Sequence, residues 1–313
     1  MAVRGESWAL KRVLCATDFS DNAAAALDAA VALARPANAK ILVVHVIPLP
    51  VRSRGGRACG PAPPGIEQKA RNEAIENLDR FRGPAADVET ERVLREGDPA
   101  EEIVQEAQRA GADLIVMGRH SRGTPNHWFL GSVAERVVRK TPCPVMVVKP
   151  FPRRRGQRPR HVICALDLRE TSAATMAHAA ALTSALQADL LVLHVVAGPA
   201  PDTVQDARAG LTALVAAASV PSDRVQQRVV AGTAHEEILG AGREGGIDLV
   251  VVGSHGGGIL DRQFIGSTTL HLLRNSDCDV LVVPAQVSPG EEQSKTRSPE
   301  LADVPAPRSL GRA

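Results

Sequence analysis

A glycine-rich stretch, "GSHGGGILDRQFIGS", runs from Gly253 to Ser267 and follows the apolar run "IDLVVVGS". Consecutive glycines leave the backbone amides uncovered by side chains, and such amides can turn together toward an anion. Gly266 and Ser267 stand where a helix would begin, and a helix N-terminus binds phosphate through its free amides and its dipole. We expect Ser267 to cap that helix. The spacing therefore predicts a phosphate site, and a simple turn is the alternative.

The stretch has a counterpart earlier in the chain, because the sequence contains itself twice. "VLCATDFSDNAAAALDAAVALA" matches "VICALDLRETSAATMAHAAALT", which places Asp18 over Asp167. "GDPAEEIVQEAQRAGADLIVMGRHS" matches "GTAHEEILGAGREGGIDLVVVGSHG", which places Gly118 over Gly253. Two homologous halves of this length predict two similar domains.

Within each half, short apolar runs alternate with segments of helical period. In the first half we expect strands at 12–17, 40–46, 88–94, 113–118 and 144–149, and helices at 21–35, 67–81, 100–110 and 132–140. Strands rich in Val, Ile and Leu indicate a parallel sheet buried on both faces. The predicted fold is α/β, with two repeated doubly wound domains, each an open five-stranded parallel sheet with helices on both faces. Ligands bind such sheets beyond the carboxyl ends of the strands, where the glycine-rich stretch lies.

The domains are expected at 8–150 and 160–285, joined by an arginine-rich linker at 151–159 and followed by a disordered tail at 286–313. The first half also carries an insertion rich in Pro, Gly and Arg at 48–65. A plain surface connection is the favoured interpretation of the insertion, and a lid or docking site is the alternative. The arginines of the linker could hold a phosphate or a nucleic acid, but we favour a solvated linker.

The composition excludes several classes of protein. A net charge of +2 provides no field to concentrate the 313-residue chain on nucleic acid or anionic lipid, and 2% aromatic residues leave few platforms for base stacking. No run reaches the roughly 18 apolar residues of a membrane span, and the N-terminus lacks the apolar core of a signal peptide. We therefore expect a cytoplasmic protein with no nucleic-acid partner and no membrane contact.

The cysteines predict neither a disulfide nor a metal site. The chain has five of them, with no CxxC pair and no Cys/His cluster of zinc spacing. Cys15 and Cys164 are related by the repeat and are expected to be small buried hydrophobic residues. Cys59 lies in the insertion and is the thiol expected to meet oxidants.

Together, these features resemble the universal stress protein family in its tandem two-domain form. They are the spacing GxxG, nine residues, G[ST]; an Asp after the first strand; "HV" at the end of the second; and "GDPAEEI" before "GADLIVMG". The resemblance covers about residues 8 to 285 and implies that ATP binds across the strand ends. Whether Mg²⁺ accompanies the nucleotide is an open alternative. In the second half the implied site consists of Ala165, Asp167, Val195, Gly253, Ser254, His255, Gly256, Gly257, Gly258, Gly266, Ser267 and Thr268.

The resemblance also implies roles for three of these residues. In ATP-binding members the Asp after the first strand contacts the nucleoside, which here is Asp167. The backbone near the end of the second strand contacts adenine, which places adenine at Val195. The small side chain of Ala165 lets the nucleoside lie close.

The first half departs from the family pattern, because Ser121 stands at the second motif glycine. If that position requires φ > 0, a β-carbon there costs about 1–2 kcal/mol, or about tenfold in occupancy. We therefore expect the second half to bind ATP and the first half to bind it more weakly. The corresponding first-half residues are Ala16, Asp18, Val46, Gly118, Arg119, His120, Ser121, Gly123, Gly131, Ser132 and Val133.

Two pairs of histidines are related by the repeat. His120 and His255 occupy equivalent places in the glycine-rich loops, and each could be a base or a phosphate contact, with an exposed loop histidine as the alternative. His45 and His194 end the second strands of the two halves. We interpret this second pair as hydrogen-bonded structural histidines.

The implied function is that of an ATP-binding regulatory or sensor protein with slow or no hydrolysis. The sequence has no GxxxxGK[ST] loop, no evident arginine finger and no carboxylate committed to Mg²⁺, so no catalytic residue is assigned. Two alternatives stay open: an ATP-consuming transferase or ATPase that uses a loop histidine, and a nucleotide-independent interaction scaffold. The resemblance further implies that the last strands, "CPVMVV" and "CDVLVV", bring the halves together about a pseudo-twofold axis. A homodimer of the whole chain and an unknown protein partner are left open.

Overall fold

The structure is a computed structural model. It describes residues 9–48, 66–81, 87–120, 130–149, 157–169, 171–198, 200–218, 220–255 and 265–285. Outside these ranges lie nearly all of the insertion with Cys59, most of the linker, the tail, and the predicted site residues Ser121, Gly123, Gly256, Gly257 and Gly258.

Strands and helices alternate in the order that the sequence predicts, with small differences at their ends. The first half contains β1 (Arg12–Thr17), α1 (Asp21–Ala37), β2 (Lys40–Pro48), α2 (Ile66–Arg80), β3 (Thr90–Gly97), α3 (Pro99–Ala110), β4 (Leu114–Gly118), α4 (Ser132–Lys140) and β5 (Val145–Val148). The second half contains β6 (His161–Leu166), α5 (Ser172–Leu186), β7 (Asp189–Val196), α6 (Pro201–Ala217), a short 3-10 turn (Ser222–Arg224), β8 (Val225–Ala231), α7 (Ala234–Glu244), β9 (Leu249–Gly253), α8 (Ser267–Asn275) and β10 (Asp279–Val283).

Local sequence explains where several helices begin and end. The Asp98 side chain accepts a hydrogen bond from the Glu101 amide at 3.0 Å, and Pro99 occupies the first turn of α3, where a missing amide proton costs nothing. Gly111 ends the same helix in the left-handed conformation, with φ of 60°. α1 begins at Ser20, whose hydroxyl accepts from the Ala23 amide at 3.2 Å.

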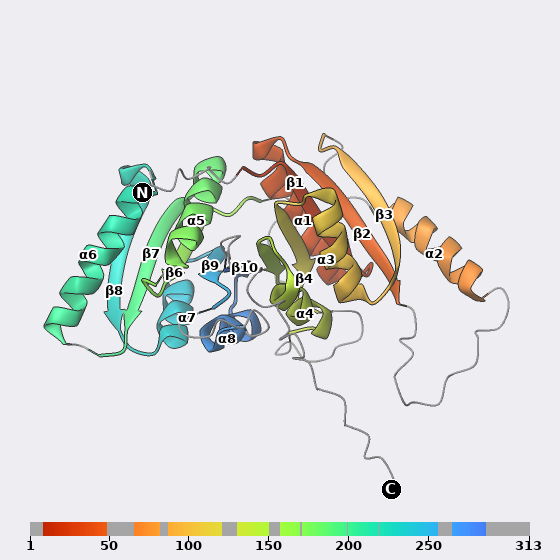
Figure 1. The fold of residues 1–313 in the computed structure, drawn as a ribbon. Helices are drawn as coiled ribbons and strands as arrows, with labels where there is room; N and C mark the ends of the chain where they lie inside the picture. The colour runs from red at the N-terminus through yellow and green to blue at the C-terminus, as the bar shows by residue number, and fades with distance from the viewer. Residues whose placement is uncertain are drawn as a thin grey trace, which may run out of the picture.

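The strands form one sheet with the order β3-β2-β1-β4-β5-β10-β9-β6-β7-β8 (Figure 1). Pairing is parallel within each half, and β5 and β10 pair antiparallel at the centre, with Met146 opposite Leu281. The strand order therefore reads the same from both edges, which relates the halves by a pseudo-twofold axis. Pairing through the last strands is as predicted, and it protects two apolar edges that would otherwise invite aggregation.

Each face of the sheet carries a hydrophobic cluster that draws on both halves. One cluster contains Val13 and Val162 with side chains of α1, α2, α5 and α6. The other contains Leu14 and Ile163 with side chains of α3, α4, α7 and α8. Alternate residues of a strand thus enter opposite clusters, because successive side chains point to opposite faces. Helices cover both faces, so the doubly wound α/β prediction is confirmed. In the described ranges, no helix combines the length and apolar character that crossing a membrane requires.

The repeat-related thiols lie inside this core. Cys15 and Cys164 are both fully buried, as the sequence predicts. Burial raises the pKa of Cys15 to about 12, and it also raises the pKa of Cys164, because a thiolate would lose its hydration there. These thiols are therefore poor nucleophiles at neutral pH.

Two cations of the first half are buried where the halves meet. Lys149 follows β5 and is 9% exposed, and its amide donates to Asp279 Oδ1 at 3.0 Å. Arg119 follows β4 and is 1% exposed, and its Nε and Nη2 make no hydrogen bond within the described part of the chain. Burial lowers the pKa of Arg119 to about 10 and that of Lys149 to about 8, and nearby Asp277 opposes both shifts in part. The seam, meaning the region where β5 and β10 join the two halves, therefore buries charged groups as well as apolar side chains.

Lys149→Met is expected to change the free energy of unfolding more favourably near pH 7 than near pH 10, by a difference of about 2 kcal/mol. The pKa of Lys149 is about 8 in the folded protein against an ordinary 10.5, so between these values the unfolded chain binds more protons. Its folded-state charge therefore costs stability at low pH, and that cost disappears as pH rises through this interval. Urea denaturation of both proteins at the two pH values measures the difference, in which other titrating groups cancel. An equal difference at both pH values would contradict the burial argument.

Candidate functional site

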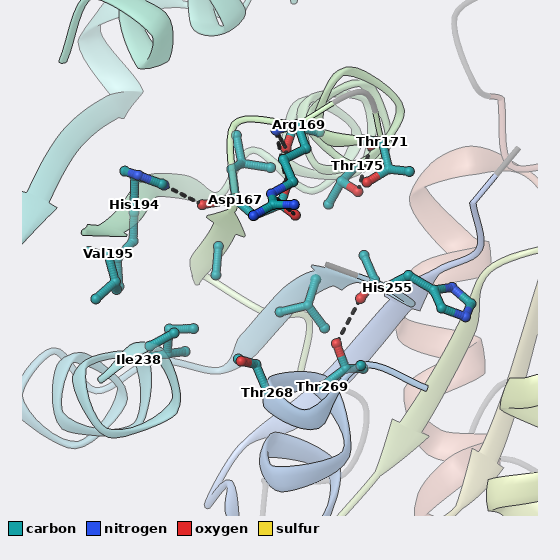
Figure 2. A pocket seen from close by; sticks show the side chains of 18 of the residues that line it. Asp167, Arg169, Thr171, Thr175, His194, Val195, Ile238, His255, Thr268 and Thr269 are labelled. Carbon is teal, nitrogen blue, oxygen red and sulfur yellow. Dashed lines mark hydrogen bonds and ion pairs between the residues drawn. The ribbon is translucent and has the colours of Figure 1, made fainter. Parts of the chain in front are cut away.

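A cavity of about 610 Å³ opens at the carboxyl edge of the sheet in the second half. Its walls come from the ends of β6, β7 and β9 and from the first turns of α5, α7 and α8 (Figure 2). β6 pairs with β7 on one side and β9 on the other, so the chain reverses its winding direction at this point. Doubly wound sheets bind ligands at such a switch point, and the volume is typical of a small-ligand or cofactor site.

The cavity brings together most of the second-half residues that the sequence predicts. Those that line it are Ala165, Asp167, Val195, Gly253, His255, Gly266, Ser267 and Thr268. Ser254 is buried instead, and its hydroxyl accepts from the Ala285 amide at 3.1 Å and lies 2.8 Å from His255 Nδ1. It therefore supports the loop rather than the cavity wall.

Sequence reasoning missed other residues of the wall. They include Arg169, Thr171, Ser172, Thr175, Ile238 and Thr269. Two of them, Thr171 and Thr175, stand four residues apart and therefore share one face of the chain as it enters α5. The sequence signal that could have identified these two residues is a pair of hydroxyl side chains four positions apart, shortly after the Asp that follows the strand.

Asp167 is held in place by a local turn. Its Oδ1 accepts from the Arg169 amide at 3.1 Å and from the Ser172 hydroxyl at 2.8 Å. Leu168 between them has φ of 58°, a left-handed conformation that costs a non-glycine residue about 1–2 kcal/mol. The repeat-related Phe19 has φ of 62° after Asp18. The same strained turn in both halves presents a carboxylate at the strand end, and such strain is typical of ligand sites.

The N-terminus of α8 forms the opposite wall. Gly266, which has no side chain to cap the helix, occupies the N-cap position, and Ser267 is the first residue of α8. The expectation that Ser267 caps α8 is therefore wrong, because the helix starts one residue earlier than a Ser cap requires. The first amides of a helix have no partner within the helix, and those of α8 lie at this edge of the sheet. Such amides favour an anion.

The first glycine of the motif has a different neighbour in each half. A β-carbon at Gly118 would lie 2.9 Å from the Asn22 carbonyl carbon, so α1 approaches β4 at backbone contact. A β-carbon at Gly253 would first meet Thr175 Oγ1, at 3.3 Å. α1 thus packs closer to its strand end than α5 does. The Asn22 side chain also donates to the His120 carbonyl at 3.2 Å, which ties α1 to the first-half loop.

The start of the helix after the strand-end Asp also differs. In the first half Ser20 caps α1, whereas Arg169 stands at the equivalent position of the second half. α5 begins at Ser172, which corresponds to Ala23 of α1, and its N-cap residue Thr171 makes no side-chain cap. Loss of a side-chain cap costs about 1 kcal/mol. The second half therefore carries an arginine in its cavity at a position where serine stabilises the helix of the first half.

The histidines are placed partly as expected. His45 Nδ1 donates to the Thr17 carbonyl at 2.8 Å, and His194 Nδ1 donates to the Leu166 carbonyl at 2.7 Å. Both make the hydrogen bond expected of a structural histidine. His255 lines the cavity, whereas His120 is 8% exposed. The alternative of an exposed loop histidine is therefore wrong for His120.

The first-half residues occupy the corresponding edge of their own sheet. Ala16, Val46 and Gly118 lie in β1, β2 and β4; Asp18 follows β1; Gly131, Ser132 and Val133 form the N-cap and first residues of α4. Asp18 Oδ1 accepts from the Ser20 amide at 3.0 Å, in the same type of turn as Asp167. Arg119 departs from this set because it is buried at the seam.

Comparison with known proteins decides the family. The sequence pattern of the universal stress protein family matches residues 9–149 and again 159–284. The chain belongs to the universal stress protein family. The double match means that this universal stress protein has the tandem two-domain form that its sequence predicts.

Individual relatives match one half of this universal stress protein. A universal stress protein of Thermus aquaticus is 36% identical over 143 residues, which is 44% of this chain and 98% of that protein. A Bacillus subtilis universal stress protein is 32% identical over 145 residues, with the same shares of each chain. The crystal structure of a universal stress protein from Archaeoglobus fulgidus has a TM-score of 0.66 and 22% identity, and the match covers 89% of this chain and 97% of that one. That structure has the same fold across both halves.

Proposed function

We propose that this universal stress protein binds an adenine nucleotide, ATP, in the second-half cavity and acts as a regulatory or sensor protein with slow or no hydrolysis. The observation that carries the proposal is a pair of facing walls. One wall holds Asp167 in a strained turn, and the other is the N-terminus of α8, whose N-cap residue Gly266 has no side chain. A carboxylate suits ribose hydroxyls and free amides suit phosphates, so the two walls match the two ends of a nucleotide.

The remaining wall residues suit the nucleoside. Ala165 contributes a small side chain at the end of β6, and Val195 presents strand backbone and an apolar surface beside it. Within the described ranges no group of three or more His, Cys, Asp or Glu side chains could hold a metal ion. Mg²⁺ bound with the nucleotide would therefore take its ligands chiefly from the phosphates and water, as this ion commonly does.

The first half is proposed to bind nucleotide more weakly. Backbone contact between Asn22 and Gly118 narrows the space beside the strand end, and the Asn22 side chain holds the loop there. In the second half α5 approaches β9 less closely, which leaves room for a ligand beside Gly253.

Acid extraction of the purified protein, followed by chromatography, tests the proposal. We expect ATP or another adenine nucleotide in the extract, in substoichiometric amount if the nucleotide exchanges during purification. Isothermal titration of the nucleotide-free protein with ATP gives affinity and stoichiometry, and we expect one strong site per chain. An empty protein that also fails to bind added ATP contradicts the proposal.

We further propose a cytoplasmic protein whose partner is another protein rather than nucleic acid or membrane. β5 and β10 are paired inside the chain and are not available to a second copy. The outer strands β3 and β8 carry exposed polar side chains such as Glu91, Arg92 and Arg228, which oppose edge-to-edge pairing. A homodimer of the whole chain would therefore form through helices or loops.

A further inference from the structure

Arg169 stands out among the residues that line the second-half cavity. It is the one lysine or arginine in the described part of that lining, where His194 and His255 are the other side chains able to carry a positive charge. Backbone amides of α8 attract an anion but carry only partial charge. Among the described lining residues, Arg169 is therefore the one side chain that always offers a full positive charge to a polyphosphate.

The guanidinium of Arg169 lines the cavity and makes only a loose ion pair with Asp167. Its Nε lies 3.9 Å from Asp167 Oδ2, which is beyond hydrogen-bond length, and its side chain is 60% exposed. Within the described ranges its side chain donates no hydrogen bond, although its amide bonds Asp167. Figure 2 shows the guanidinium beside Asp167, with Thr268 and Thr269 on the wall across the cavity. Turning the guanidinium toward a ligand would give up this loose ion pair but no side-chain hydrogen bond of the described ranges.

The other half supplies a natural comparison. Ser20 occupies the equivalent position there and stabilises α1 as its N-cap. At this position the second half lacks the capping serine, and Thr171, the N-cap residue of α5, makes no side-chain cap. Arg169 thus stands where serine stabilises a helix in the first half, and its side chain lines a cavity, which is better explained by a ligand than by the fold.

We propose that Arg169 makes the second-half site selective for nucleotides with a polyphosphate chain by donating hydrogen bonds to the phosphates. This inference rests on the proposed nucleotide function and adds the class of ligand: ATP and ADP in preference to adenosine or a cyclic monophosphate. Arginine suits this task because its planar guanidinium bonds two phosphate oxygens at once.

Arg169→Ser, which installs the residue of the first half, tests the inference by isothermal titration with ATP, ADP, cAMP and adenosine. We expect ATP affinity to fall about tenfold at low ionic strength, and adenosine affinity to stay within about twofold. The loss for ATP should shrink at high ionic strength, because salt screens an exposed cation. Tm should stay unchanged or rise by about 2 °C, because serine can cap α5.

Two further variants complete the design. Arg169→Lys keeps the charge but loses the planar pair of donors, and should recover only part of the ATP affinity. Arg208→Ser removes an exposed cation of α6 that does not line the cavity, and should leave ATP affinity unchanged. Equal losses for ATP and adenosine in Arg169→Ser would mean that the arginine only orients Asp167, and would overturn the inference. An unchanged ATP affinity would overturn it as well while leaving the proposed function intact. A wild-type protein that binds none of the four ligands would overturn both.

Discussion

Gly118→Ala is expected to lower the free energy of unfolding by about 3 kcal/mol, and Gly253→Ala by about 1 kcal/mol or less. The two glycines are equivalent in the repeat, but their surroundings differ. A β-carbon at Gly118 would lie 2.9 Å from the carbonyl carbon and 3.0 Å from the carbonyl oxygen of Asn22, and this backbone moves only if α1 shifts. At Gly253 the nearest atom is Thr175 Oγ1 at 3.3 Å, which belongs to a side chain that can rotate.

Urea denaturation followed by circular dichroism measures both values on the full chain. Gly253→Ala serves as the matched control, because it makes the same chemical change at the same place in the motif. Equal losses in the two variants would contradict the closer packing of α1. The comparison thus measures how much closer α1 packs against the motif glycine than α5 does.

Ala165→Leu is expected to weaken ATP and adenosine binding in the second half by about a hundredfold or more. Ala165 lines the cavity at the end of β6, where the proposed nucleoside lies, and a leucine side chain would occupy that space. Loss of adenosine as well as ATP is expected, because the obstruction concerns the nucleoside rather than the phosphates. Isothermal titration with both ligands measures the effect, and circular dichroism shows whether the fold is kept.

The repeat supplies the control for this experiment too. Ala16→Leu makes the same change in the first half, and it should leave the strong site unchanged. If Ala16→Leu removes the strong site and Ala165→Leu does not, ATP binds chiefly in the first half and the proposed asymmetry is reversed.

Much of the architecture is determined by sequence alone. Runs such as "ILVV" and "DLVVVG" can be buried only in a sheet covered on both faces, and the repeat assigns the same arrangement to both halves. Helix ends are determined locally where a specific residue is required, as at Asp98 and Gly111. The location of the cavity follows as well, because the carboxyl ends of parallel strands share one edge. These features depend on residues a few positions apart or on strict periodicity.

Sequence alone was less accurate where an element depends on its neighbour in the sheet. The third strand was predicted at 88–94, whereas β3 spans Thr90–Gly97. β3 is an edge strand with no buried residue, and its end is determined by pairing with β2, where Gly97 lies opposite Pro48. Ser267 was a reasonable cap by residue type, but the preceding Gly266 takes that position.

The sequence already distinguishes the halves at Ser121, but only the tertiary structure decided how their packing differs. Contact of Asn22 with Gly118, burial of Arg119 at the seam and the placement of Arg169 in the cavity join residues from different elements. The seam itself joins Lys149 to Asp279, 130 residues apart in the chain. Propensity and periodicity act within one element, whereas these contacts depend on how closely helices and strands pack against one another. Two halves with one pattern can therefore share a fold and still offer different sites.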